Sequence, residues 1–148
     1  MKSIFDKAIR DEMISRINSL NEHSRPQWGK MNIYQMLKHC TRWEEMMQGK
    51  TRYKRMFIGR LFGKMALKKV LKDEAPLRRS TPTLPELIVK ENDGNISIQK
   101  KEWISRIEAY AHYSSANFVH VFFGKMTEEQ IGYLVYKHID HHLRQFNC

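Results

Sequence analysis

Residues 127–146, TEEQIGYLVYKHIDHHLRQF, restrict the fold of this chain more than any other stretch. Thr127 and Gln130 have the spacing of a capping box, which predicts that a helix begins here. At about 100° per residue, four apolar side chains share one face of that helix, namely Ile131, Leu134, Val135 and Phe146. Charged side chains lie on the opposite face, namely Lys137, Asp140 and Arg144. The stretch is therefore predicted to be a long amphipathic helix.

Three further segments show helical spacing of their apolar residues, namely residues 3–20, 32–49 and 97–116. Asn32 and Gln35 form a second capping box, and Gly49 is suited to the end of that helix. No segment alternates apolar and polar residues as a half-buried strand would. We therefore expect an all-α protein with four main helices.

A long basic crossover, residues 50–79, separates the second of these helices from the third. Its middle is predicted to be helical, with an apolar side formed by Phe57, Ile58, Leu61, Phe62, Met65 and Val70. The proline-containing residues 75–86 should be extended. Four helices with one long crossover make a known bundle topology. We therefore expect a four-helix bundle in a single domain over residues 1–148.

Composition restricts the setting in which the chain works. Its 148 residues are enough to bury a sizeable core. The 26 Lys and Arg residues against 16 Asp and Glu give a formal net charge of +10, which suits an anionic partner. Two cysteines, Cys40 and Cys148, make no disulfide framework and favour a reducing, cytoplasmic setting. The sequence predicts no membrane span and no signal peptide, because no apolar run reaches the ~18 residues that a span needs.

His138 and His142 fall in the middle of the apolar face of the last helix, one turn apart. Burying two imidazoles is costly without polar partners, and this spacing suits two ligands of one metal ion. His39, on the apolar side of the second helix, is the candidate third ligand. It lies about 10 Å from the start of its helix, and the other two lie roughly 9 Å from the end of theirs, so antiparallel packing would place them together. A set of hydrogen-bonded core histidines is the alternative interpretation.

Three other polar residues are candidates for the rim of such a site. His141 falls at the edge of the apolar face, and Gln145 and Arg144 lie nearby. His141 could orient a ligand or accept a proton, although a solvated surface would suit all three residues as well. His120 is a poor candidate ligand, because it precedes the last helix and His138 lies about 17 Å along the axis from Thr127.

Two stretches show a resemblance to a known superfamily. RPQWGKMNIYQMLKHC resembles a Trp-Gly-x-Met element that leads into the first metal histidine of a branch of the DinB-like (DinB/YfiT) metalloenzymes, a branch described as a domain of unknown function. FFGKMTEEQIGYLVYKHIDHHLRQF resembles the closing helix of the same branch. The resemblance covers nearly the whole chain, and Val121 departs from it where a proline is expected after His120.

The resemblance implies an up-down-down-up four-helix bundle. It also implies one divalent metal ion, nickel or zinc and occasionally iron, bound by His39, His138 and His142. Characterised relatives include transferases that use low-molecular-weight thiols and a thiol-dependent isomerase, and dimers are common among them. The resulting hypothesis is a metal-dependent enzyme, a thiol transferase or a hydrolase, that acts on a small molecule.

A binding module without catalytic activity is the alternative function. The basic Lys50–Arg79 segment would then be the working surface for an anionic partner, either nucleic acid or anionic lipid. A solvated face on a lysine-rich chain would show the same pattern. Nucleic acid is not favoured, because the DinB name reflects a damage-inducible context and is no evidence of DNA binding.

Overall fold

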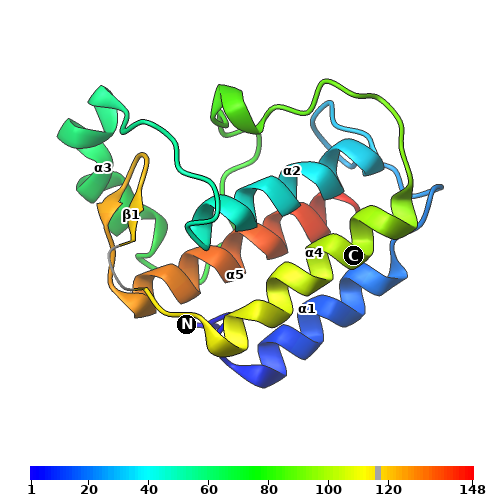
Figure 1. The fold of residues 1–148 in the computed structure, drawn as a ribbon, viewed down its shortest axis with the longest axis horizontal. Helices are drawn as coiled ribbons and strands as arrows, with labels where there is room; N and C mark the ends of the chain where they lie inside the picture. The colour runs from blue at the N-terminus through cyan, green and yellow to red at the C-terminus, as the bar shows by residue number, and fades with distance from the viewer. Residues whose placement is uncertain (116–117) are drawn as a thin grey trace.

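The computed structural model describes residues 1–115 and 118–148, and the chain is mostly helical (Figure 1). Over these residues its α-helices are α1 (Lys7–Ser19), α2 (Ile33–Met47), α3 (Phe57–Val70), α4 (Ile96–Glu108) and α5 (Glu128–Gln145). The short 3-10 helices are η1 (Pro85–Leu87) and η2 (Ala109–His112). An antiparallel hairpin joins β1 (Val119–His120) to β2 (Gly124–Lys125). The prediction of a mostly helical chain is confirmed, and the small hairpin is an addition to it.

Both predicted capping boxes are present, at the starts of α2 and α5. The Asn32 side chain accepts a hydrogen bond from the Gln35 backbone amide, and the Gln35 side chain accepts one from the Asn32 amide. Thr127 and Gln130 make the same reciprocal pair. Each box satisfies amide groups that the first turn of a helix leaves without partners, so local sequence fixes where both helices begin.

Four of the helices surround the main core, and α3 lies outside it. α2 contacts both α4 and α5, and α1 contacts the same two helices. In Figure 1, α1 and α5 run from left to right, whereas α2 and α4 run from right to left. The core between them includes Met13, Ile17, Met36, Leu37, Trp103, Ile107, Val135 and Ile139. No helix within the described part of the chain is long and apolar enough to cross a membrane.

The helix predicted over residues 97–116 is shorter in the structure. α4 ends at Glu108, and η2 continues it only as a tight 3-10 turn that ends before Tyr113. Tyr113 has extended backbone angles, and its hydroxyl donates to the Met47 carbonyl. The chain therefore leaves the helix axis where it reaches the end of α2. Ala116 lies outside the described residues.

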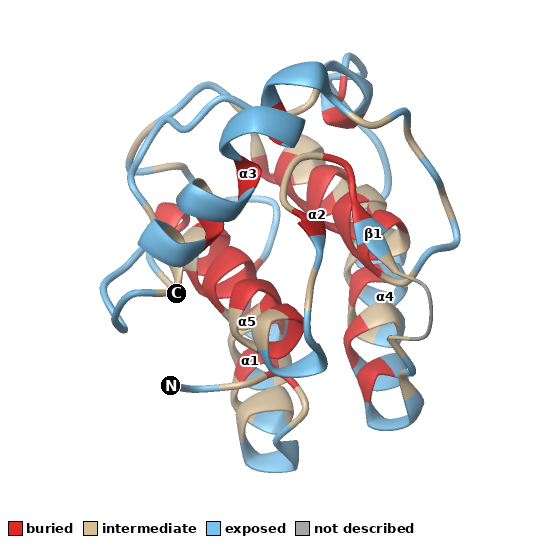
Figure 2. Cartoon of the chain, turned by 90° about the vertical axis from the view of Figure 1, so that its left-hand side faces the viewer, coloured by how far each residue is buried: buried red, intermediate tan, exposed pale blue. Residues whose placement is uncertain are grey.

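The helix predicted within the basic crossover is confirmed as α3, but its large apolar side faces solvent (Figure 2). Five of the six predicted side chains are between 51% and 76% exposed, namely Phe57, Ile58, Leu61, Phe62 and Met65. α3 instead buries a face of small residues, because Gly59 and Gly63 lie against the backbone of Phe122 in the hairpin. A Cβ atom at Gly63 would overlap the Phe122 carbonyl oxygen, so this contact requires glycine.

One carboxyl group is fully buried between α2 and α4. Glu44 accepts a hydrogen bond of 2.5 Å from the Tyr110 hydroxyl, and its other oxygen has no hydrogen-bond partner among the described residues. Burial raises the pKa of Glu44 to about 8, although the hydrogen bond from Tyr110 offsets part of that shift. The folded protein therefore holds this carboxyl protonated at neutral pH.

We expect Glu44→Gln to remove a pH-dependent loss of stability. Folding raises the pKa of Glu44 from 4.5 to about 8. The contribution of the protonated Glu44 carboxyl to the free energy of unfolding is therefore fully present below pH 4.5 and is lost as pH rises towards about 8. Across that window Glu44 should lower the free energy of unfolding by at most about 1.4 kcal/mol per pH unit. Urea denaturation at several pH values measures this slope, with the exposed-site variant Glu86→Gln as the control. Equal pH dependence in wild type and Glu44→Gln would contradict the prediction.

Candidate metal centre

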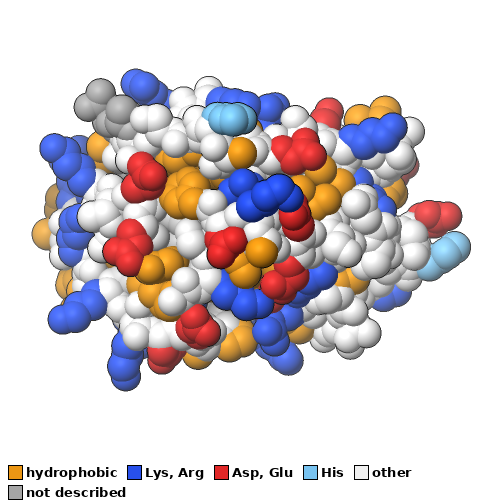
Figure 3. All heavy atoms as spheres, turned by 90° about the horizontal axis from the view of Figure 1, so that it is seen from below, with side chains coloured by type: hydrophobic (Ala, Val, Ile, Leu, Met, Phe, Trp, Pro, Cys, Tyr) orange, Lys and Arg blue, Asp and Glu red, His pale blue; other side chains and the backbone are white. Residues whose placement is uncertain are grey.

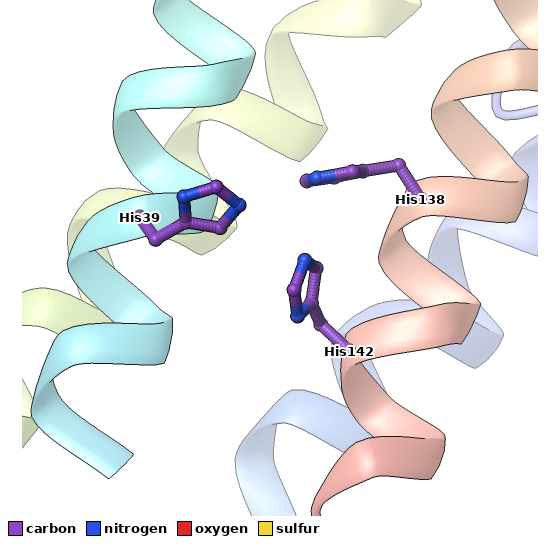
Figure 4. Close-up of side chains that lie close together, drawn as sticks. All are labelled: His39, His138 and His142. Atoms are coloured by element: carbon purple, nitrogen blue, oxygen red, sulfur yellow. The ribbon is translucent and has the colours of Figure 1, made fainter. Parts of the chain in front are cut away.

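The pairing of α2 with α5 brings three histidines together (Figure 4). His39 comes from α2, and His138 and His142 come from α5, one turn apart. Because the two helices run in opposite directions, the three side chains meet at one level of the core. One nitrogen of each ring lies within 4.8 Å of the others. We call these three residues the histidine triad.

The rings of the triad surround a common space. Their centroids are 5.6 Å apart for His39 and His138, 5.0 Å for His39 and His142, and 4.7 Å for His138 and His142. None of the three histidines is more than 9% exposed. Bonds from zinc to imidazole nitrogen are about 2.0–2.1 Å long, so the three nitrogens would lie closer together than 4.8 Å around a shared ion.

The crossover between α2 and α4 fixes the orientation of His39. Nδ1 of His39 lies 3.1 Å from the Leu87 carbonyl oxygen in η1. A carbonyl oxygen only accepts hydrogen bonds, so the neutral ring has its proton on Nδ1 and its lone pair on Nε2. The Leu87 side chain is buried in the core, which anchors this carbonyl beside α2.

Gln145 fixes the ring of His142 through two hydrogen bonds. Its amide nitrogen donates to the Trp28 carbonyl at 2.8 Å, so its amide oxygen faces Nδ1 of His142 at 2.9 Å. Because that oxygen only accepts, His142 also has its proton on Nδ1 and its lone pair on Nε2. Gly29, with a φ of +83°, allows the loop to approach, since a Cβ atom there would lie 2.7 Å from the Gln145 nitrogen.

Trp43 orients the third ring, that of His138, by stacking. The two ring centroids are 3.8 Å apart, with only 9° between the ring planes. Nδ1 of His138 is buried and has no hydrogen-bond partner among the described residues. Such a nitrogen is costly in a folded protein, and a bound ligand would offset the cost. The three rings are therefore not a fully hydrogen-bonded set of core histidines, and they could hold a metal ion.

Burial keeps the triad uncharged at neutral pH. Desolvation and, to a lesser extent, the neighbouring rings lower the pKa of His142 to about 3 and lower that of His138 well below its usual value. Desolvation also lowers the pKa of His39, against the opposing effect of its hydrogen bond to Leu87. Neutral imidazole is the form that binds metal ions, so the rings are in their ligand form at pH 7.

His141 lies at the rim of the triad. It is half-buried, and its ring centroid is 5.1 Å from that of His142 and 5.7 Å from that of Trp28. The guanidinium of Arg79 lies over the Trp28 ring, 4.2 Å from its centroid. Burial lowers the pKa of His141, so this imidazole is neutral at pH 7 and able to accept a proton. The rim thus combines a neutral imidazole with a nearby cation.

Arg144, the third predicted rim residue, is engaged elsewhere. Its Nε donates to Asp140 at 2.6 Å, and the same carboxylate accepts from Arg16 of α1 at 2.8 Å. Asp140 is two residues from both His138 and His142, which is about 200° around α5. It therefore lies on the opposite side of the helix from the triad, the side that contacts Arg16 of α1. Arg144 therefore belongs to the contact between α1 and α5, whereas Gln145 contacts the triad directly.

Sequence reasoning missed several groups that orient the triad. Trp43 follows His39 by four positions, and helical spacing places both side chains on the apolar face of that helix, but it does not show that Trp43 stacks on His138. Leu87 and Trp28 contribute backbone carbonyls from segments outside the long helices, and no sequence pattern marks such a role.

The remaining histidines stay outside the triad. Nδ1 of His120 accepts hydrogen bonds of 3.1 Å from the backbone amides of Phe122 and Phe123, which stabilises the hairpin. His23 and His112 are exposed. Within residues 1–115 and 118–148, the triad is the one group of three or more metal-ligating side chains found at this spacing.

A separate cleft lies near the end of α2, the start of α3 and the hairpin. It has a volume of about 580 Å³, and its lining includes Met46, Tyr53, Arg60, Tyr113 and Val121. None of the triad residues lines this cleft. The cleft and the candidate metal centre are therefore distinct features of the molecule.

Comparison with known proteins assigns this chain to a family but does not give it an activity. Residues 5–148 match the family described as Protein of unknown function (DUF1569). No curated protein and no solved structure matches the chain. The family match covers all three residues of the triad and every helix. The chain therefore belongs to the DUF1569 family of proteins of unknown function.

Proposed function

We propose that the triad binds one divalent metal ion and that the chain is a metal-dependent enzyme acting on a small molecule. The orientation of the rings is the observation on which this proposal rests. His39 and His142 have their protons directed outwards on Nδ1, to Leu87 and Gln145, so each has only an acceptor nitrogen left. Two acceptors cannot hydrogen-bond to each other, but both can bind a cation. This argument favours a metal site over a set of hydrogen-bonded core histidines.

The donor set narrows the choice of metal. Neutral imidazole nitrogens suit zinc, nickel and iron, whereas calcium and magnesium prefer oxygen ligands. Three protein ligands leave a coordination position for a small molecule, which is the usual arrangement of catalytic sites. A divalent ion bound there would supply Lewis acidity and lower the pKa of a thiol or a water molecule.

Groups at the rim would serve the substrate. His141 is neutral at pH 7 and adjoins His142, so we propose that it accepts the proton that a thiol or water releases. Arg79 lies over Trp28 beside the same rim and would attract an acidic substrate. Gln145 would act through His142 by holding its ring in the ligand tautomer.

The resemblance to DinB-like enzymes supports the same three ligands and suggests a thiol as the nucleophile. α1 and α5 run in one direction, and α2 and α4 run in the other. This arrangement supports the up-down-down-up bundle expected of that superfamily. We therefore propose a single bundle domain with thiol transferase activity, and a hydrolase as the alternative reaction at the same site.

Metal content is the first test of the proposal. Untagged wild-type protein should contain about one equivalent of zinc, nickel or iron, and His138→Ala should contain almost none, because it removes a ligand from a site of three. His112→Ala, at an exposed histidine, should retain the wild-type content. Mass spectrometry of purified protein measures the metal. A metal-free wild type that takes up neither zinc nor nickel on addition would contradict the proposal.

The role proposed for Gln145 predicts a graded effect on affinity. Gln145→Leu keeps the triad but removes the acceptor for His142, so metal affinity should fall roughly 10- to 100-fold. Gln145→Glu keeps an acceptor and should retain more of the affinity than Gln145→Leu. Competition with a chelator measures the affinities, and Gln27→Leu, at an exposed amide in the adjoining loop, is the control. Unchanged affinity in Gln145→Leu would show that the hydrogen bond has no such role.

Turnover separates an enzyme from a binding module. Metal-loaded wild type should catalyse the reaction of a low-molecular-weight thiol with an electrophile, and His138→Ala should fall to the uncatalysed rate. His141→Gln should lower the rate and flatten its pH dependence, because it removes the proposed proton acceptor. Lys68→Gln with Lys69→Gln, on α3, should leave the rate unchanged. A metal-loaded protein inactive towards every thiol and every ester or amide would refute the enzymatic part of the proposal.

A further inference from the structure

The exposed apolar side of α3 has no partner within the part of the chain that the structure describes. We call it the apolar stripe, and it consists of Phe57, Ile58, Leu61, Phe62 and Met65. At about 100° per residue, these side chains span an arc of about 140° around the helix. Soluble monomers seldom expose so many large apolar side chains side by side, and such surfaces mark binding sites for proteins or membranes.

Packing on the opposite side of α3 holds the stripe outwards. Gly59, Gly63 and Leu67 are its buried residues, and the two glycines lie against the backbone of Phe122. Lys64 donates to the Lys125 carbonyl in the hairpin. A helix attached in this way cannot turn its stripe inwards without losing the glycine contacts. The exposure of the stripe is therefore a consequence of the fold.

Cations of the same segment border the stripe. Arg60 and Lys64 lie along one side of it, and Lys68 and Lys69 follow its C-terminal end. Residues 50–72 contain nine Lys and Arg residues and no Asp or Glu. Figure 3 shows Lys and Arg side chains beside hydrophobic ones at its left edge, the end of the molecule at which α3 lies in Figure 1. The surface of α3 is thus both apolar and strongly positive.

We infer that α3 binds the surface of an anionic lipid bilayer. An amphipathic helix of 14 residues lies in the plane of such an interface, with its apolar side at the acyl boundary and its Lys and Arg residues at the head-group phosphates. A second copy of the chain fits less well, because a two-fold contact through the stripe would bring the same cations face to face. An anionic bilayer accommodates the stripe and the cations together.

This surface is independent of the proposed enzymatic function. α3 packs on the hairpin, whereas the triad lies between α2 and α5. The inference stands whether or not the triad binds a metal. If both are correct, the protein works at a membrane surface while its metal site stays within the helical core.

Vesicle sedimentation tests the inference. Wild-type protein should bind vesicles of phosphatidylglycerol and phosphatidylcholine at least tenfold more tightly than vesicles of phosphatidylcholine alone, and added salt should weaken the binding. Leu61→Ser with Phe62→Ser should weaken it at least tenfold. Lys68→Gln with Lys69→Gln should weaken it roughly thirtyfold at low salt, which is the effect expected of two charges near an anionic surface.

Matched variants remove the same kinds of group from other exposed positions. Ile88→Ser with Ile98→Ser, and Lys90→Gln with Lys101→Gln, should bind like wild type. Circular dichroism establishes that each variant is folded, and single substitution of Leu61 replaces any stripe variant that is not. Equal binding of wild type to both kinds of vesicle, or undiminished binding of the folded stripe variants, would overturn the inference.

Two further measurements distinguish other occupants of the stripe. Sedimentation equilibrium would show a dimer that Leu61→Ser with Phe62→Ser dissolves if a second copy covers α3. Titration with a DNA duplex would show tighter binding than to anionic vesicles if the cations serve nucleic acid instead. Either result would replace the lipid surface as the partner.

Discussion

Burial of three uncharged imidazoles between α2 and α5 is the constraint on which the rest of the structure depends. In this structure the two helices run in opposite directions, with His39 in the middle of α2 and His138 and His142 in the second half of α5. They can stay in an apolar core only as neutral rings, which the lowered pKa values of all three indicate. The helical core therefore determines both the position and the ionisation state of the triad.

The helices alone do not satisfy these rings. The partner of His39 is a carbonyl in η1, and the partner of His142 is an amide that the loop before α2 holds in place. The short 3-10 helix η1 and the loop before α2 are thereby tied to the core. Backbone outside the long helices has carbonyl groups that no helical ladder uses. The two segments that show no helical spacing in the sequence therefore supply the ring orientation that a metal site would need.

Sequence periodicity predicted most of the fold because capping and apolar spacing are local properties. The starts of α2 and α5 follow from two capping boxes, and antiparallel helices account for the meeting of His39 with His138. That these residues bind a metal stays a prediction. Periodicity could not show that Arg16 of α1 pairs with Asp140, or that Leu87 supplies an acceptor, since both depend on which segments meet in three dimensions. It also overestimated the length of α4, which ends at Glu108 and continues only as the 3-10 turn η2 before Tyr113 contacts the end of α2.

α3 shows why periodicity alone leaves the buried side of a helix undetermined. It has two apolar faces, one with large side chains and one with Gly59 and Gly63. A hydrophobicity argument chooses the large face as the buried one, but the backbone of Phe122 comes too close for any residue except glycine. Close backbone approach thus decides the orientation, and the larger apolar surface stays outside. Folding does not require Phe57 or Leu61 at these exposed positions, so their presence beside a cluster of cations is better explained by binding than by packing.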